Sequence, residues 1–226
     1  MKTEFAPSSW KIPPKKVLSL EEISQITKIN HQAKEEAMEN GDHAPIIEWM
    51  VWNTSCWGLR ISESAYLECG QVCLDSSLPY LALTKTKGGK PRDVFVSSVF
   101  AGFLKEYLAW KKANNEPTDE HDPFFFSHVT KTFMTPEGLR KAFKRAIKRS
   151  NITKNVTPHC GRHSMGTHMA RFDLKMVQEM LGHSSLATTE IYTHVLTPHI
   201  QNFIDFYESL VYSHLQKKSN KNSLEE

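Results

Sequence analysis

Hydrophobic residues recur at helical spacing along much of the first quarter of the chain. The segment Ser19-Leu20-Glu21-Glu22 has the form of a capping box, so we expect a helix to begin there and to continue to about Glu39. Asn40-Gly41 supplies residues that commonly end a helix. Pro45 suits the first turn of a second helix, whose apolar positions continue to about Cys56.

A glycine then separates the second helix from a short third one. Gly58 breaks the helical pattern, and Ser62 can cap a new helix that has Glu63 in its first turn. This interpretation leaves Arg60 in the loop between the two helices.

Beyond Gly70 the hydrophobic period changes from helical to extended. Three short strands are expected, at residues 72–74, 80–86 and 93–96. Gly88-Gly89 is a typical hairpin turn between the last two strands, and a helix over residues 98–113 and a polar loop follow them. The pattern predicts an α+β fold that is mainly α-helical and contains a small three-stranded antiparallel sheet.

One further predicted helix carries much of the positive charge. Thr135-Pro136-Glu137 combines a cap, a first-turn proline and an acidic first turn. The apolar positions that follow have the spacing of a core-facing stripe: Leu139, Ala142, Phe143, Ala146 and Ile147. The opposite face is basic: Arg140, Lys141, Lys144, Arg145, Lys148 and Arg149.

This basic face stands out against a weakly charged chain. Residues 131–154 contain eight basic side chains and one acidic side chain, a net charge of +7, while the whole chain has a formal net charge of +3. Such a concentration is typical of proteins that bind the phosphate backbone of nucleic acid. A solvated basic face without such a partner is the alternative interpretation of this helix taken alone.

The composition of the 226 residues is ordinary for a globular protein, with 39% apolar and 23% charged residues. No apolar run approaches the ~20 residues that cross a bilayer, and the polar, proline-rich residues 1–16 lack the apolar region of a secretory signal. The four cysteines have no disulfide-scaffold spacing, which favours a cytoplasmic location.

Chemically versatile side chains gather in the last third of the chain. Thr157-Pro158-His159-Cys160-Gly161-Arg162-His163-Ser164 brings an arginine and two imidazoles together, and His183 and Tyr192 follow. On a helix His159 and Arg162 share a face, so both could contact one phosphate. Ionising a phenol with a pKa of ~10 at pH 7 costs roughly 4 kcal/mol. Guanidinium or imidazole donors beside Tyr192 would reduce that cost.

Each of these residues also has a plainer interpretation. His159 or Arg162 alone is more often structural, and Tyr192 alone is most often a buried ring with a bonded hydroxyl. Residues 172–195 have the outline of a helix–turn–helix that only binds DNA. A zinc site is a weaker alternative, because no second ligand pair completes four ligands with Cys160, His163 and His168.

Five segments taken together resemble the motifs of the tyrosine recombinase (phage-integrase-like) family. They occur in the family order: Gly58 to Glu63 (the first arginine box), Thr86 to Arg92 (the hairpin lysine box), Thr157 to His163 (the His-x-x-Arg box), Leu181 to Ser184, and Thr189 to Val195. The resemblance covers residues 18–212 and implies the fold of that family's catalytic domain. Residues 1–17 are then expected to form a flexible basic arm, and residues 213–226 a disordered polar tail.

The resemblance implies a site-specific DNA recombinase that cuts and rejoins DNA through a 3′-phosphotyrosine and needs neither metal, cofactor nor ATP. Tyr192 would be the nucleophile, with Arg60 and Arg162 on the non-bridging phosphate oxygens. His159 would assist proton transfer at the tyrosine, and His183 would hydrogen bond to a phosphoryl oxygen.

Two more roles follow from the resemblance. Lys87 on the hairpin would protonate the departing 5′-oxygen, although Lys85 has the same strand parity and Lys90 lies across the turn. Glu63 would support the arginines from behind, without touching the phosphate.

The implied partner is double-stranded DNA with inverted-repeat sites in a prokaryotic cytoplasm. Typical family members carry a helical DNA-clamping domain ahead of the catalytic one, whereas about 18 residues precede the first helix here, so an accessory DNA-binding protein is a candidate partner. The apolar helix expected between Thr197 and Leu215 resembles the segment through which family members form homo-oligomers, such as a tetramer on DNA. Packing of this helix on the chain's own core is the alternative.

Two other functions use the same scaffold. One is strand cleavage and religation of the type IB topoisomerase kind, and the other is a non-catalytic DNA-binding regulator. The presence of all six expected catalytic side chains weighs against the regulator.

Overall fold

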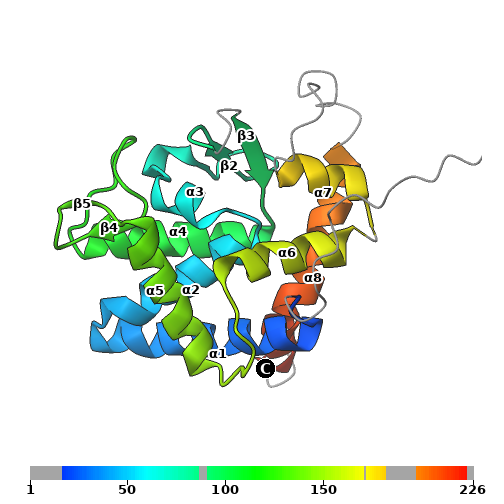
Figure 1. Ribbon diagram of the computed structural model, residues 1–226, viewed down its shortest axis with the longest axis horizontal. Coiled ribbons are helices and arrows are strands. Elements are labelled where there is room, and N and C mark those ends of the chain that lie inside the picture. Colours follow the sequence, from blue (N-terminus) through cyan, green and yellow to red (C-terminus); the bar gives the residue numbers. More distant parts are fainter. Residues whose placement is uncertain (1–16, 87–90, 171, 182–196, 223–226) are drawn as a thin grey trace, which may run out of the picture.

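The computed structural model describes residues 17–86, 91–170, 172–181 and 197–222, which form helices and two small antiparallel sheets (Figure 1). The helical segments are α1 (Leu20–Asn40), α2 (His43–Cys56), α3 (Ile61–Ala65), the 3-10 turn η2 (Cys69–Gln71), α4 (Ser98–Ala113), α5 (Pro136–Arg149), α6 (Pro158–Met169), α7 (Leu174–Met180) and α8 (Thr197–Asn222). The strands are β1 (Val72–Cys73), β2 (Tyr80–Leu83), β3 (Arg92–Phe95), β4 (Phe126–Ser127) and β5 (Thr132–Phe133). The predicted arm, residues 1–17, lies outside the described residues apart from Val17.

The first two helices confirm the sequence prediction. The Ser19 hydroxyl accepts the N–H of Glu22 at 3.2 Å, and the Glu22 carboxylate accepts the N–H of Ser19 at 2.8 Å, which completes the capping box. Gly41, with a φ of 71°, ends α1. The second helix, α2, packs against α1, α4, α5 and α6, so its side chains, Trp49 and Trp52 among them, are buried on several sides.

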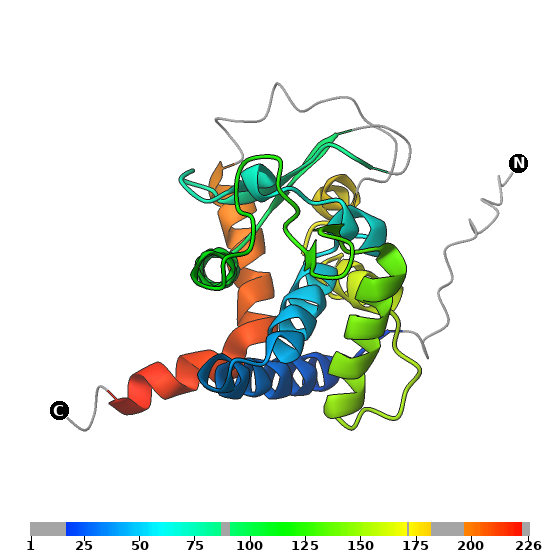
Figure 2. The same ribbon diagram turned by 90° about the vertical axis from the view of Figure 1, so that its left-hand side faces the viewer.

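The three-stranded sheet lies at the end of the molecule opposite α1 (Figures 1 and 2). Strand β2 pairs antiparallel with both neighbours in the order β1-β2-β3, with Leu81 opposite Val72 and Val94. Leu81 and Val94 are buried, as the side chains that face the helices should be. The predicted sheet is therefore confirmed, although β2 ends at Leu83 and the Gly88-Gly89 turn lies outside the described residues.

A second hairpin, β4–β5, stands where the sequence predicts only a polar loop. Each of its strands has two residues, which is too short to show an alternating pattern. Its turn contains Lys131 at a φ of 55°, a left-handed conformation that glycine usually signals in a sequence. The hairpin leads directly into α5.

Helices α4 and α5 also follow the prediction. Helix α4 has the predicted bounds. The Thr135 hydroxyl caps α5 by accepting the N–H of Gly138 at 3.0 Å. The whole predicted apolar stripe of α5 is buried: Leu139, Ala142, Phe143, Ala146 and Ile147.

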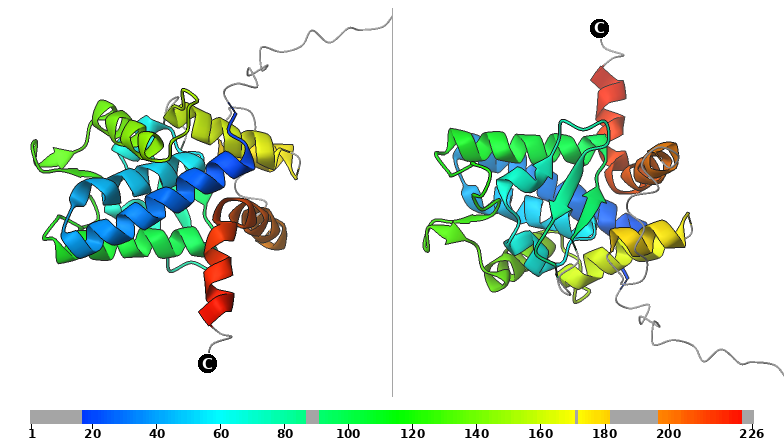
Figure 3. Two further views of the ribbon diagram at one scale, coloured as in Figure 1. Left: turned by 90° about the horizontal axis from the view of Figure 1, so that it is seen from below. Right: turned by 90° about the horizontal axis from the view of Figure 1, so that it is seen from above.

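Helix α8 changes direction at Tyr212, whose backbone is not helical, and its last part projects from the body of the molecule (Figures 2 and 3). Before this kink Phe203 and Ile204 are buried, and the Tyr207 hydroxyl donates to the Cys56 carbonyl at 2.6 Å. The apolar face of α8 therefore packs on the chain's own core, which is the alternative to packing on a neighbouring subunit.

Helix α8 continues through Asn222, past residue 213, where the polar tail is expected to begin. Residues 199–222 contain neither glycine nor proline, so nothing in the local sequence stops the helix. Among the helices of the described residues, none combines the length and apolarity needed to cross a membrane.

Candidate active site

A sharp turn at Gly58 leads from α2 to the first arginine box. Gly58 has a φ of 88°, a left-handed conformation that favours glycine. A β-carbon at this position would lie 2.9 Å from the Leu181 side chain, closer than real contacts allow. The backbone conformation thus favours glycine here, and a larger residue would also displace the end of the Leu181 side chain.

Arg60 caps α3, so the predicted cap at Ser62 is wrong. The Glu63 carboxylate accepts the backbone N–H of Arg60 at 2.7 Å through Oε2 and its guanidinium N–H at 2.7 Å through Oε1. A carboxylate three residues after the cap can bond back to the cap N–H, and this starts the helix two residues earlier than Ser62 would. Arg60 is held by its own helix and keeps 26% of its side chain exposed.

Glu63 also binds Arg92, a residue that the sequence analysis does not assign to the site. The guanidinium of Arg92, on β3, donates to both carboxylate oxygens of Glu63 at 2.8 Å and to the Met180 carbonyl at 3.0 Å. Burial raises the pKa of Glu63, but hydrogen bonds and charge from Arg92, and then hydrogen bonds from Arg60, lower that pKa below its ordinary value. The only sequence signal for Arg92 is its place at the end of the hairpin lysine box.

Arg162 is buried and joins three segments of the chain. From α6 it donates to the carbonyls of Gly58 and Leu181, and its guanidinium lies 3.8 Å from the Glu63 carboxylate. Burial, and then the positive charge of Arg60, lowers the pKa of Arg162 to about 9. The guanidinium therefore stays charged at neutral pH beside a second positive charge.

We call Arg60, Glu63, Arg92 and Arg162 the arginine cluster. Three guanidinium groups face one carboxylate, so the cluster has a net charge of +2. Like charges held together in a partly buried site favour the binding of an anion. Planar guanidinium forks are well matched to the oxygens of a phosphate group.

His159 is exposed at the start of α6, one turn before Arg162. Its ring packs against His163, with ring centroids 3.8 Å apart and the two Nε2 atoms in contact. Since Arg162 is buried and His159 is exposed, the face that they share lies at the boundary between core and surface.

Several predicted site residues lie outside the described residues: Lys87, Lys90, His183 and Tyr192. Lys85, an alternative to Lys87, is described, and its ammonium lies 2.7 Å from the Glu68 carboxylate. The assignments of Lys87, His183 and Tyr192 stay predictions.

The basic side chains of α5 differ in what they contact. Arg145 and Arg149 both bind the buried Glu48, so these two side chains fasten α5 to α2. Arg140 pairs with Glu137 at 3.2 Å on the surface. The other three basic side chains are exposed, and no ion pair to them occurs within the described part of the chain: Lys141, Lys144 and Lys148.

The zinc alternative of the sequence analysis finds no support among the described residues. The imidazole of His168 bonds to the Leu18 carbonyl at 2.8 Å, and the sulfur of Cys160 contacts the Thr157 hydroxyl at 3.2 Å. Their ligand atoms do not converge with those of His163.

Comparison with known proteins places this site in context. The model of the phage integrase family matches residues 16–199. The tyrosine recombinase XerC of Lacticaseibacillus casei (strain BL23) is 34% identical over 154 residues, which cover 66% of this chain and 51% of XerC. The chain thus spans about half the length of the curated relatives it matches.

Solved structures share the fold. The crystal structure of XerA recombinase has a TM-score of 0.59 and 23% identity, and the match covers 84% of this chain and 64% of XerA. XerH site-specific recombinase bound to difH substrate in a pre-cleavage complex has a TM-score of 0.59 and 25% identity, with coverage of 82% and 52%.

Proposed function

The chain belongs to the phage integrase family, and we propose that it is a site-specific recombinase that cuts and rejoins DNA through a covalent tyrosine–phosphate bond. The observation that carries this proposal is the arginine cluster, where three guanidinium groups from three segments of the chain meet on the single carboxylate of Glu63. Such a site is suited to the charge that develops on a phosphodiester during displacement at phosphorus.

The proposed reaction exchanges one phosphate ester for another. The Tyr192 oxygen attacks the phosphorus, and the bond between phosphorus and the 5′-oxygen breaks. His159 assists removal of the phenol proton, and Lys87 gives a proton to the 5′-oxygen, which leaves as a hydroxyl. The 5′-hydroxyl of a second strand then attacks the phosphotyrosine and releases Tyr192. Each step forms one ester bond and breaks one, so neither ATP nor a cofactor is required.

The bonds of the two predicted phosphate-binding arginines support this assignment. A guanidinium has five N–H groups. Arg162 uses two of them on the carbonyls of Gly58 and Leu181, and Arg60 uses one on Glu63. The remaining N–H groups of each arginine can bind non-bridging phosphate oxygens, and Glu63 and Arg92 hold the pair in place.

The arginine cluster also anchors the chain just ahead of the predicted His183 and Tyr192. Arg92 binds the carbonyl of Met180 and Arg162 binds that of Leu181, two neighbouring residues at the end of α7. The segment that would deliver the nucleophile therefore starts from the same side chains that would hold the phosphate.

The proposal also covers the DNA substrate, the extent of the catalytic domain and the cellular location. Double-stranded DNA with inverted repeats is the proposed substrate, with residues 18–212 as the catalytic domain and the cytoplasm as the location. The exposed lysines of α5 would contact the DNA backbone: Lys141, Lys144 and Lys148. The proposed active form is a tetramer on DNA that is assisted by an accessory DNA-binding protein.

The test is a covalent-trapping assay with the full chain. The probe is a nicked duplex that carries the inverted repeats flanking the gene, from which the cleaved strand end diffuses away. Wild-type protein is expected to form a denaturant-resistant protein–DNA adduct, and Tyr192→Phe is expected to form none. Tyr66→Phe, at a tyrosine that is 45% exposed, is the matched control and should behave as wild type. An adduct formed by Tyr192→Phe would refute the nucleophile assignment.

The trapping assay and a plasmid assay together separate the other two functions. A non-catalytic regulator would bind the duplex without forming an adduct. An enzyme of the topoisomerase IB kind would relax supercoiled plasmid without producing Holliday junctions or recombinant strands, whereas a recombinase produces both.

A further inference from the structure

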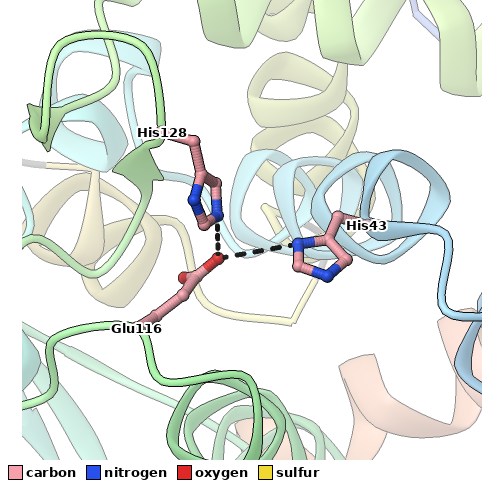
Figure 4. A group of neighbouring side chains, drawn as sticks. All are labelled: His43, Glu116 and His128. Carbon is pink, nitrogen blue, oxygen red and sulfur yellow. Dashed lines mark hydrogen bonds and ion pairs between the residues drawn. The ribbon is translucent and has the colours of Figure 1, made fainter.

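A second group of chemically reactive side chains lies outside the arginine cluster (Figure 4). It consists of His43, Glu116 and His128, whose side chains point toward one another. His43 is the first residue of α2, Glu116 lies in the loop after α4, and His128 directly follows β4. Three separate segments thus bring two imidazoles and a carboxylate to one point.

The distances among these side chains are close to those of a metal site. Oε1 of Glu116 lies 2.8 Å from Nε2 of His128 and 3.9 Å from Nδ1 of His43. The three ligand atoms all lie within 4.8 Å of one another. Around a tetrahedral zinc ion each ligand is about 2.1 Å from the metal, so neighbouring ligand atoms are about 3.4 Å apart. Small rotations of the imidazoles would meet that geometry.

The Glu116 carboxylate is fixed from its other side. Its side chain is 1% exposed, and the buried ammonium of Lys111 donates to Oε2 at 3.1 Å and to the Pro123 carbonyl at 3.0 Å. Because Lys111 occupies Oε2, the oxygen that faces the two imidazoles is Oε1. The positive charge of Lys111 opposes a cation, so binding depends on direct bonds from both histidines.

We propose that His43, Glu116 and His128 bind a divalent transition-metal ion, with zinc as the favoured ion. Two imidazole nitrogens and one carboxylate oxygen form a ligand set that suits zinc and leaves one position open for water. Calcium and magnesium require more oxygen ligands than this group offers. The side chains of His43 and His128 are 36% and 48% exposed, which leaves an open side for the ion to enter.

A bound ion would link the β4–β5 hairpin to the body of the molecule. His128 lies in the turn of that hairpin, and His43 and Glu116 lie on α2 and on the loop after α4. The hairpin leads into α5, which carries the basic face. Zinc would therefore restrict the motion of the segment that precedes this helix.

The test measures zinc itself and is independent of recombination. The full chain is stripped with a chelator and titrated with zinc chloride by calorimetry, with metal content checked after desalting. Wild type is expected to bind one ion per chain. His43→Ala and His128→Ala are each expected to bind it at least about tenfold more weakly, because even outer partners of metal ligands contribute about 10–100-fold.

The matched control is His121→Ala. His121 also contacts a glutamate, Glu68, at 3.1 Å, but its side chain is 83% exposed and lies outside the group. This variant should bind zinc as wild type does, and circular dichroism without zinc should show all four proteins folded. If wild type binds no zinc, the group is only an ion-pair network and the proposal is wrong. Equal binding by all four proteins would place the ion elsewhere and would also overturn it.

Hydrogen exchange gives a second readout. Zinc should slow amide exchange over residues 126–133 in wild type and leave it unchanged in His43→Ala. Exchange in wild type that does not respond to zinc would contradict the proposed link between the hairpin and α2.

Discussion

Two buried glutamates, Glu63 and Glu48, each bind arginines, but their surroundings give them different uses. Both carboxylates are 1% exposed. Glu63 hydrogen bonds to Arg60 and Arg92 and lies near Arg162. Glu48 on α2 instead binds Arg145 and Arg149 of α5, which we call the Glu48 pair.

The difference lies in what else the arginines contact. Arg162 and Arg92 are buried or nearly so and donate to carbonyls at the Gly58 turn and at the end of α7. In the Glu48 pair, by contrast, Arg145 is 54% exposed, and Arg149 donates to Asn30 of α1 at 2.9 Å. The first arrangement concentrates charge where chain segments converge, and the second fastens a surface helix to its neighbours.

An arginine bound to a buried glutamate therefore does not by itself mark an active site. The arginine cluster differs by its larger excess of positive charge, three guanidinium groups on one carboxylate instead of two, and by the bonds of its arginines to the Gly58 turn and the end of α7. Fewer basic side chains of α5 are then available for DNA than the sequence predicts, because Arg145 and Arg149 already bind Glu48.

The largest expected effect is on cleavage when Arg162 is removed. Arg162→Ala should slow adduct formation by about 10³-fold or more, because a buried guanidinium aimed at a phosphoryl group is worth that much in comparable sites. Single-turnover trapping on the nicked duplex measures it. Arg145→Ala, from the Glu48 pair, should cleave at nearly the wild-type rate, and equal losses in both variants would show that Glu63 and Glu48 hold their arginines for the same purpose.

Arg92 should act by positioning Glu63 and the end of α7. Arg92→Ala is expected to lower the cleavage rate at saturating DNA by about 10–100-fold, as loss of a supporting partner commonly does, with little change in DNA affinity. Arg92→Lys should rescue only partly, because an ammonium cannot bond to both carboxylate oxygens as a fork. A variant that loses affinity but keeps its saturated rate would instead place Arg92 at the DNA.

Breaking the Glu48 pair should affect stability rather than chemistry. Glu48→Gln is expected to lower the free energy of unfolding by about 2 kcal/mol, since two charge-assisted hydrogen bonds weaken in a buried site. Urea denaturation measures the change. Glu137→Gln is the control, because its pair with Arg140 is exposed and worth only about 0–1 kcal/mol. A similar loss in both variants would show that the Glu48 pair contributes no more than a surface pair.

The smallest expected effect is on DNA affinity at the basic face. Lys144→Ala should reduce the slope of log K against log salt by about 1, because one phosphate contact is lost. Arg145→Ala should change the slope less, since the Arg145 guanidinium is already bound to Glu48. Filter binding at several salt concentrations measures both, and a larger change for Arg145→Ala would show that this arginine leaves Glu48 to bind DNA.

Local signals in the sequence predicted much of the fold. The capping box at Ser19, the Thr135-Pro136 helix start and the stripe on α5 all involve residues close together in the chain, so their patterns depend on neighbours that the sequence displays. The prediction for the cap of α3 is wrong because serine is a more common cap residue than arginine, which favours Ser62 over Arg60. Glu63 decides the start by binding Arg60.

In the candidate site, too, short motifs indicated some residues and only the packing of distant segments placed another. The sequence identified Arg60, Glu63, His159 and Arg162 through short motifs and their resemblance to a family, and the structure brings Arg60, Glu63 and Arg162 together. It did not indicate Arg92, because the bond between Arg92 and Glu63 spans 29 positions and depends on how β3 packs against α3 and α7.

The sequence by itself predicted most helix starts, the sheet and the basic face, because each depends on residue type and short spacing. The expectation that Arg60 and Arg162 hold a phosphate came from the resemblance of their motifs to those of a family. Only the tertiary structure decided which charges meet. In the folded chain Arg145 and Arg149 pair with Glu48, and the apolar face of α8 packs on the chain's own core. His43, Glu116 and His128 lie next to one another. Contacts of this kind depend on the packing of distant segments, which leaves no periodic signal in the chain.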